Sequence, residues 1–125
     1  MPGEGRKILI VEDDFYIREL YQRQFAQAGY AVEVAGSADE GIEKAKAGHQ
    51  DVVLLDLMMP GKSGFDALKM IKADETLVNT KVIILTNLGQ EDIIKEGFKQ
   101  AADGYLIKSS HTPSEIVKEV ENYFT

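Results

Sequence analysis

The sequence contains no cysteine. This absence excludes a disulfide framework, thiolate metal sites, iron–sulfur clusters and a cysteine nucleophile, and it suits a reducing compartment. Long apolar runs are also lacking, because the longest, such as Val52–Leu55 and Val82–Leu85, have four residues. A helix needs roughly 20 apolar residues to span a bilayer. We therefore expect a cytoplasmic protein with no membrane segment.

Positive charge is in short supply. The chain has 14 Lys and Arg residues against 21 Asp and Glu, which gives a formal net charge of -7 at pH 7. This balance repels a phosphate backbone, so we expect no direct contact with nucleic acid. A length of 125 residues fits one domain that can bury a core without covalent cross-links. We expect residues 1–6 to form a flexible leader and residues 7–125 to form the domain.

Short apolar runs recur along the chain and predict buried strands. The four clearest are Ile8–Val11, Val52–Leu55, Val82–Leu85 and Tyr105–Ile107. A continuous apolar run without alternation is typical of a strand that is covered on both faces. A fifth run, Tyr30–Ala35, places Glu33 between two valines. That mixed pattern predicts an edge strand.

Segments of helical periodicity separate these runs. The first predicted helix has an apolar stripe and stops at Gly29, and the second begins with a capping box at Ser37–Glu40. The third begins at a cap, Ser63, and the fourth is expected over Gln90–Lys99. The fifth begins with a capping box at Thr112–Glu115. In the fourth helix we expect Ile93, Ile94, Gly97 and Phe98 to be buried. Five strands then alternate with five helices. This order predicts an α/β fold, a flavodoxin-like doubly wound (βα)5 sandwich whose parallel sheet has the strand order 2-1-3-4-5.

Polar side chains stand where the predicted strands end. They are Glu12, Asp13 and Asp14 after the first strand, Asp56 after the third, Thr86 after the fourth and Lys108 after the fifth. In a parallel sheet these ends meet at one edge, where ligands bind. Two carboxylates about 5 Å apart repel by about 3 kcal/mol at an effective dielectric constant near 20, so the cluster needs a cation or a raised pKa. An all-oxygen set of ligands suits a hard cation, and an open site favours Mg²⁺.

Thr86 and Lys108 add one hydroxyl and one ammonium to this cluster. A metal ion and Lys108 would neutralise a phosphoryl group, Thr86 would donate a hydrogen bond to it, and an aspartate would attack it. Asp56 is the best nucleophile because it stands alone at the end of the central strand. Glu12 and Asp13 are paired and suited to holding the metal ion.

These residues resemble the receiver domains of two-component response regulators. The resemblance covers nearly the whole chain, and the segments that carry it are Ile8–Asp14, Asp56–Gly64, Leu85–Thr86 and Ala102–Lys108. It implies a signalling domain that is not an enzyme, except that it catalyses its own phosphotransfer and slow autodephosphorylation. Asp56 would accept a phosphoryl group from a phosphohistidine on a sensor histidine kinase or a histidine phosphotransfer protein.

The resemblance also implies a ligand set and a switch. Asp13, Asp56 and the main-chain carbonyl of Met58 would hold Mg²⁺, and Glu12 would act partly through water. Thr86 would move toward the phosphoryl group and leave space into which Tyr105 turns. The surface of the fourth helix, fifth strand and fifth helix would then change for a downstream protein target. The chain would be a monomer or a weak dimer that depends on phosphorylation.

The first helix and the loop after Lys108 resemble the surface on which a kinase docks. The helix residues concerned are Phe15, Tyr16, Arg18, Glu19 and Gln22, and the loop spans Ser109 to Thr112.

Two features depart from the family pattern. Lys108 is followed by Ser109, where the family usually has a proline after a cis peptide bond. A cis bond before serine costs about 3 to 4 kcal/mol, so either the bond is strained or the loop takes another path. Asn87 replaces a residue that is usually small, and Met58 and Leu88 are apolar where they can govern attack by water. We therefore predict slow self-hydrolysis.

Three other functions fit parts of the pattern. A flavodoxin-like electron carrier is disfavoured, because Glu12, Asp13 and Asp14 would repel a flavin phosphate. A metal-dependent phosphatase would need a second acid two residues after Asp56, where Met58 stands. The alternative that we retain is a protein-interaction module on a receiver scaffold that is not phosphorylated. Whether the chain is a stand-alone regulator or a fragment of a longer protein stays open.

Overall fold

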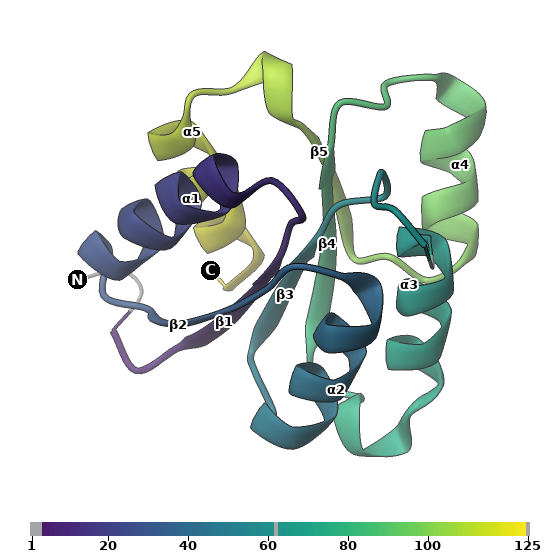
Figure 1. The fold of residues 1–125 in the computed structure, drawn as a ribbon, viewed down its shortest axis with the longest axis horizontal. Coiled ribbons are helices and arrows are strands. Elements are labelled where there is room, and N and C mark those ends of the chain that lie inside the picture. The colour runs from purple at the N-terminus through teal and green to yellow at the C-terminus, as the bar shows by residue number, and fades with distance from the viewer. Residues whose placement is uncertain (1–3, 62, 125) are drawn as a thin grey trace.

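A computed structural model describes residues 4–61 and 63–124, so residues 1–3 of the predicted leader lie outside the described residues. Five parallel strands form one sheet in the order β2-β1-β3-β4-β5, which confirms the predicted topology (Figure 1). The strands are β1 (Lys7–Val11), β2 (Ala31–Ala35), β3 (Val52–Leu55), β4 (Lys81–Thr86) and β5 (Gly104–Ile107). The α-helices are α1 (Phe15–Gln27), α2 (Ala38–Gly48), α3 (Gly64–Ala73), α4 (Glu91–Lys99) and α5 (Pro113–Glu121). Short 3₁₀ helices are η1 (Glu75–Leu77), η2 (Lys108–Ser110) and η3 (Asn122–Phe124).

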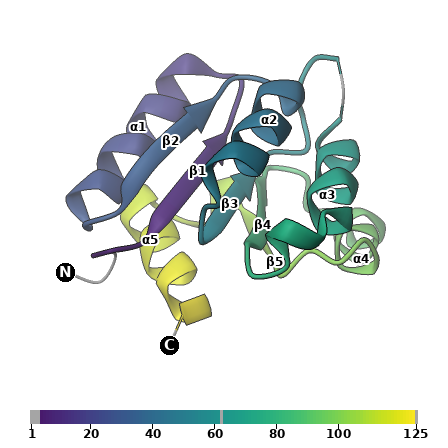
Figure 2. The same cartoon turned by 90° about the horizontal axis from the view of Figure 1, so that it is seen from below.

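The core has two halves, one on each face of the sheet. Ile8 and Ile10 of β1 point to the half that α1 and α5 cover, whereas Leu9 and Val11 point to the half under α2 and α3. Figure 2, which looks from below, shows the helices on both sides of the sheet. Both faces of β1 are therefore buried, which explains why Ile8–Val11 is apolar at every position.

The helix starts follow the predicted signals with one difference. At α5, Thr112 accepts a hydrogen bond from the main-chain N–H of Glu115, whose carboxylate accepts one from the N–H of Thr112, so the capping box is complete. At α2, Ser37 accepts from the N–H of Glu40. The Glu40 carboxylate, however, accepts from the N–H of Gly36, 2.8 Å away, instead of that of Ser37. The predicted box at Ser37–Glu40 is therefore only half formed, because the returning carboxylate reaches one residue further back.

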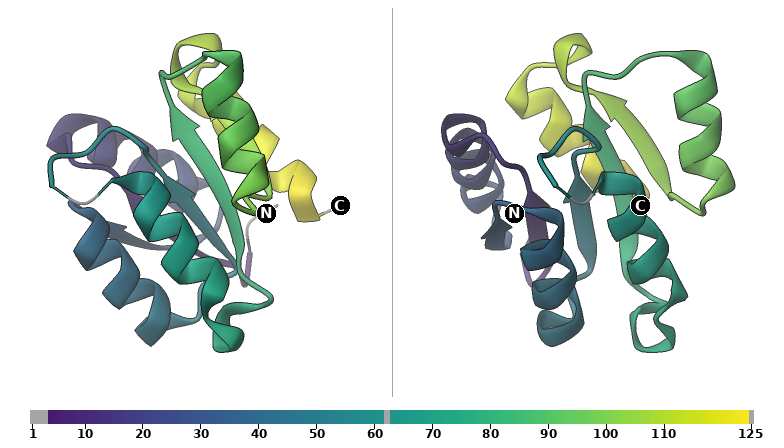
Figure 3. Two further views of the ribbon diagram at one scale, coloured as in Figure 1. Left: turned by 90° about the vertical axis from the view of Figure 1, so that its right-hand side faces the viewer. Right: turned by 45° about the vertical axis from the view of Figure 1, so that its right-hand side comes forward.

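Helix α4 differs from the expected burial. Gly97 is buried, but the side chain of Phe98 is 49% exposed and Ile93 and Ile94 are only partly covered. A Cβ atom on Gly97 would lie 2.8 Å from Cδ1 of Ile84, so the glycine allows the helix to approach the sheet closely. Figure 3 shows α4 beside β5 at one edge of the sheet. A helix at an edge covers little of the sheet, and Phe98 therefore turns away from the core.

Strand β2 forms the other edge, as Glu33 predicted. Its residues alternate in exposure, and Glu33 is exposed. The ammonium of Lys44, from α2, donates a hydrogen bond to the main-chain carbonyl of Val34 over 2.6 Å. This contact ties α2 to the outer side of the strand.

The two ends of the described chain lie on the same side of the domain (Figures 1 and 2). The main-chain carbonyl of Arg6 accepts a hydrogen bond from the N–H of Ala31, and its guanidinium lies over the ring of Phe124 at 4.4 Å. Arg6, the last residue of the predicted leader, therefore contacts both β2 and the C-terminal segment. Among the described residues, no helix has the length and apolar character needed to cross a membrane.

Candidate functional site

The acidic residues after β1 are placed by the turn into α1. The N–H of Glu12 donates to the carbonyl of Ala35, which continues the sheet by one bond and directs the Glu12 side chain inward. Glu12 is buried, whereas Asp13 is exposed. The Asp14 carboxylate caps α1, because it accepts from the N–H groups of Tyr16 and Ile17. Asp14 therefore acts as a helix cap, and the other two acids face the site.

Asp56 follows β3, in the middle of the sheet. Its N–H donates to the carbonyl of Val11, and its side-chain Oδ1 accepts from the N–H of Met58 over 3.0 Å. The chain then folds back, so that α3 begins close to it. A Cβ atom on Gly64 would overlap the main-chain carbonyl oxygen of Asp56 and lie 2.6 Å from Cα of Leu57. Only a glycine fits at the start of α3 without moving the segment that carries Asp56.

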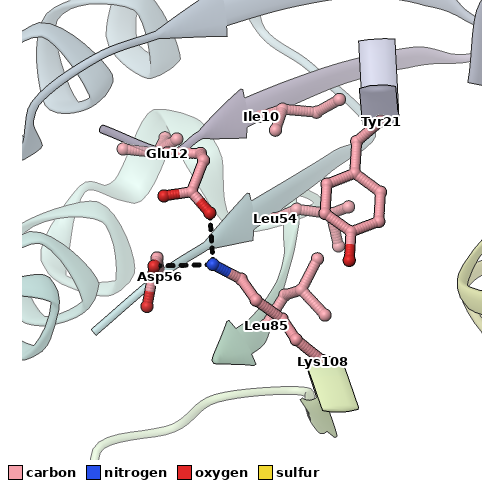
Figure 4. Close-up of a pocket in the computed structure, with 8 residues that line it drawn as sticks. Ile10, Glu12, Tyr21, Leu54, Asp56, Leu85 and Lys108 are labelled. Atoms are coloured by element: carbon pink, nitrogen blue, oxygen red, sulfur yellow. Dashed lines mark hydrogen bonds and ion pairs between the residues drawn. The ribbon is translucent and has the colours of Figure 1, made fainter. Parts of the chain in front are cut away.

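Lys108 reaches across the end of β4 to join both buried carboxylates, as the dashed lines in Figure 4 show. Its Nζ atom lies 2.8 Å from Oδ2 of Asp56 and also contacts Oε1 of Glu12. These side chains and Tyr21, from α1, line a small cavity. Tyr21 lies on the apolar stripe of α1 that ends before Gly29, and nothing in its spacing indicates that it borders the site.

The site shows both features expected to reduce repulsion between clustered acids, namely a nearby cation and a raised pKa. Burial raises the pKa of Glu12, although the hydrogen bond and charge of Lys108 act in the opposite direction. Burial by itself would lower the pKa of Lys108, but its hydrogen bonds to Asp56 and Glu12 outweigh that effect and raise it. Lys108 is therefore charged at neutral pH and holds the two carboxylates together.

The acidic cluster also fits a metal ion. One carboxylate oxygen from each of Glu12, Asp13 and Asp56 lies within 4.8 Å of the others. The three ligands are all oxygen, the exposed Asp13 leaves one side open to water, and no histidine or cysteine belongs to the group. This chemistry suits a hard cation such as Mg²⁺.

The predicted switch residues lie at the next strand ends. Thr86, the last residue of β4, is fully buried, and its hydroxyl is 3.5 Å from the N–H of Leu88. The hydroxyl of Tyr105, on β5, donates to the carbonyl of Leu88 over 2.6 Å. The ring of Tyr105 packs against the half of the core under α2 and α3. The loop after β4 is thus attached to β5 through Tyr105.

The loop after Lys108 takes the second of the two paths considered above. The described residues include no cis peptide bond, and Lys108–Ser110 form the 3₁₀ helix η2. The N–H of Ser109 donates to the side-chain oxygen of Asn87 over 2.9 Å. The sequence identified both residues as departures from a family pattern but did not predict that they contact each other.

Comparisons with known proteins agree with this arrangement. Residues 8–121 match the response regulator receiver domain family. The chain is 36% identical over 115 residues to the transcriptional regulatory protein ResD of Bacillus subtilis, covering 92% of this chain and 46% of ResD. It therefore spans about half the length of that relative. It is 34% identical over 117 residues to the chemotaxis protein CheY of Thermotoga maritima, covering 91% of this chain and 93% of CheY.

Solved structures share the fold. The chemotaxis protein CheY4 of Vibrio cholerae superposes with a TM-score of 0.87 at 29% identity, covering 94% of this chain and 97% of CheY4. A CheX–CheY–BeF3–Mg²⁺ complex from Borrelia burgdorferi gives a TM-score of 0.89 at 25% identity, covering 98% of this chain and 92% of the matched chain. The sheet order, the acidic pocket and these matches describe a receiver domain of two-component response regulators. The chain belongs to the response regulator receiver domain family.

Proposed function

We propose that Asp56 accepts a phosphoryl group from a phosphohistidine on a sensor histidine kinase or a histidine phosphotransfer protein. The observation that carries this proposal is the position of the Asp56 carboxylate, which lies beside Glu12 and Asp13 and is bound by Lys108. The nucleophile Asp56, the acidic metal ligands and the Lys108 ammonium lie together at the carboxyl ends of the strands. Phosphoryl transfer to a carboxylate requires this arrangement.

The reaction follows from the chemistry of this set. An oxygen of Asp56 attacks phosphorus and the bond between phosphorus and the donor imidazole nitrogen breaks. The electron pair of that bond stays on the nitrogen, and the imidazole leaves as a neutral ring that keeps the proton already on its other nitrogen. The product is an acyl phosphate on Asp56. Lys108 and Thr86 then contact the phosphoryl oxygens, so Lys108 exchanges one carboxylate partner for the new group. Glu12, Asp13, Asp56 and the carbonyl of Met58 would hold Mg²⁺.

When bound, Mg²⁺ neutralises negative charge on the phosphoryl oxygens. The matched structure from Borrelia burgdorferi is a complex of CheX and CheY with BeF3 and Mg²⁺, and this supports the same chemistry here. The similarity at 91% coverage to Thermotoga maritima CheY supports it as well.

Two surfaces would serve the partners. The first helix presents Phe15, Tyr16 and Leu20, whose side chains are 53%, 81% and 41% exposed, beside the acidic site. We propose that this apolar surface contacts the phosphohistidine protein. On the other side, movement of Thr86 toward the phosphoryl group would shift the loop to which Tyr105 is bonded, and the α4–β5–α5 surface would change for a downstream protein.

Intact-mass measurement tests the reaction. The parent chain, incubated with acetyl phosphate and Mg²⁺, should gain the mass of one phosphoryl group, and Asp56→Asn should gain none. Asp92→Asn, at an exposed position of α4, is the control and should behave like the parent. A parent chain without the mass gain under conditions in which it is folded would contradict the proposal and favour an interaction module that is not phosphorylated.

The lifetime of the phosphorylated chain gives a second readout. Met58 and Leu88 offer no polar side chain that orients an attacking water, so we predict slow self-hydrolysis. After the donor is removed, loss of the added mass should take much longer than seconds. A half-life of only seconds would refute this part of the proposal.

A further inference from the structure

One hydrogen bond joins the segments that follow β4 and β5, next to Thr86 and Lys108. The N–H of Ser109 donates to Oδ1 of Asn87 over 2.9 Å, although 22 residues separate them. The last pair of β4 and β5 in register is Thr86 and Ile107. The bond therefore lies just beyond the end of the ladder and links the two strands once more, through a side chain. We call this contact the Asn87–Ser109 clasp.

The clasp provides an acceptor for a main-chain N–H group at the start of η2. The first N–H groups of a helical turn have no partner within the turn, and η2 begins after Ile107, whose side chain provides no cap. Asn87 provides the missing acceptor from another element. A proline at 109 would have no N–H to donate, and a small apolar residue at 87 would have no acceptor. The two departures from the family pattern thus depend on each other.

A second bond holds the same loop. The Tyr105 hydroxyl donates to the carbonyl of Leu88, so Leu88 is attached to β5, before Lys108, and Asn87 is attached to Ser109, after it. The main chain at Thr86 and the main chain at Lys108 are consequently fixed relative to each other from two sides. Of these two bonds, the clasp is the one that acts on the loop carrying the Lys108 ammonium.

We propose that Asn87 is a positioning residue for phosphoryl transfer, an inference that rests on the proposed function. Through the N–H of Ser109 it holds the start of η2, so that Lys108 spans Glu12 and Asp56 before a phosphoryl donor arrives. It also makes Thr86 and Lys108 move as one unit. Without the clasp, Lys108 is in place for a smaller fraction of the time, and phosphoryl transfer is slower.

Amide hydrogen exchange tests the contact in the absence of any phosphoryl donor. In the parent chain the Ser109 N–H should exchange slowly, and in Asn87→Ala it should exchange at least tenfold faster. Asn87→Asp keeps an acceptor oxygen and should retain the protection. Because Asn87 is exposed, the urea midpoint of Asn87→Ala should stay close to that of the parent. Unchanged Ser109 exchange in Asn87→Ala would overturn the clasp.

The rate of phosphorylation by acetyl phosphate tests the role. Asn87→Ala should be about three- to tenfold slower than the parent, as expected for loss of one hydrogen bond. In the Ser109→Pro background, which lacks the donor, the same substitution should change the rate by less than about twofold, because the bond is already gone. A proline at this position is what the family usually carries. Equal effects in both backgrounds would overturn the positioning role even if exchange at Ser109 changes.

The two tests separate the clasp from the proposed function. A parent chain that takes no phosphoryl group refutes the function, and with it the role of Asn87 in transfer, while the exchange experiment still reports on the contact. Loss of Ser109 protection together with a slower rate that disappears in the Ser109→Pro background supports the proposal in full.

Discussion

Replacing Lys108 with methionine should expose the electrostatic cost of the acidic site. The two ion pairs of Lys108 are buried, since the side chains of Lys108, Glu12 and Asp56 are 12%, 4% and 7% exposed. Methionine has a similar volume and no charge, so Lys108→Met leaves two carboxylates facing each other without a cation. Removing one partner of a buried ion pair costs about 3 to 5 kcal/mol.

Protonation sets an upper limit to this loss. Protonating a carboxyl whose ordinary pKa is about 4.3 costs about 3.7 kcal/mol of free energy at pH 7 and about 1 kcal/mol at pH 5. The variant can lose no more than this cost, because one protonated carboxyl removes the repulsion. Burial already raises the pKa of Glu12, and without the ammonium this pKa rises further. A raised pKa in the folded state means that stability recovers as the pH falls. We therefore expect Lys108→Met to lose about 3 kcal/mol of unfolding free energy at pH 7 and about 1 kcal/mol at pH 5.

Urea denaturation at both pH values, with a chelator present so that no divalent ion competes, measures the two losses. Lys95→Met is the matched control, because its ion pair with Glu91 joins side chains that are 75% and 84% exposed. That variant should change stability by less than about 0.5 kcal/mol at either pH. If Lys108→Met lost the same free energy at pH 5 as at pH 7, the loss would come from packing and our electrostatic account of the site would be wrong.

Two further substitutions test how the fold supports the site. Thr112→Ala removes the cap of α5 and should cost about 1 kcal/mol in urea denaturation near neutral pH. Two hydrogen bonds lower the pKa of Glu115: one from the main-chain N–H of Thr112, which Thr112→Ala leaves in place, and one with the Thr112 side chain, which it removes. The stabilisation that the side chain gives this carboxylate is present above its ordinary pKa and is lost as the pH falls through the lowered value, so the deficit should shrink in acid; a constant deficit would contradict this reasoning. Gly64→Ala forces a Cβ atom against the main chain of Asp56 and should cost at least about 1 to 3 kcal/mol, whereas Gly89→Ala, whose Cβ atom meets only Cδ1 of Ile107 at 3.7 Å, should be tolerated far better. Equal urea midpoints for the two glycine variants would refute the steric argument.

The sequence predicted the sheet well because its signal is local. The run Val52–Leu55 matches β3 at both ends, and Glu33 correctly placed β2 at an edge. Burial on α4 was predicted less well, because helical periodicity identifies an apolar face but not how much of it the sheet covers. Phe98 was expected in the core and is half exposed, since the helix lies over the last strand and touches it at Gly97.

In the candidate site, too, some features follow from the sequence pattern and others depend on packing. The carboxyl ends of parallel strands must meet, so the proximity of Glu12, Asp13 and Asp56 follows from the topology alone. The path of the Lys108 side chain, which crosses the end of β4 to reach two carboxylates, depends on packing and does not follow from the topology. The pairing of Asn87 with Ser109 depends on the path of a loop, and no pattern within either segment indicates it.

The ammonium of Lys44 on the carbonyl of Val34 bears on how copies of this domain behave at high concentration. An edge strand presents main-chain groups to which a strand of another molecule can add, and such addition leads to aggregates. Because β1 pairs with Ala35 and Ala31 on its own side, the Val34 carbonyl faces outward, and a newcomer would have to displace Lys44 before it could bond there. Lys44 thus hinders the addition of a further strand beside β2.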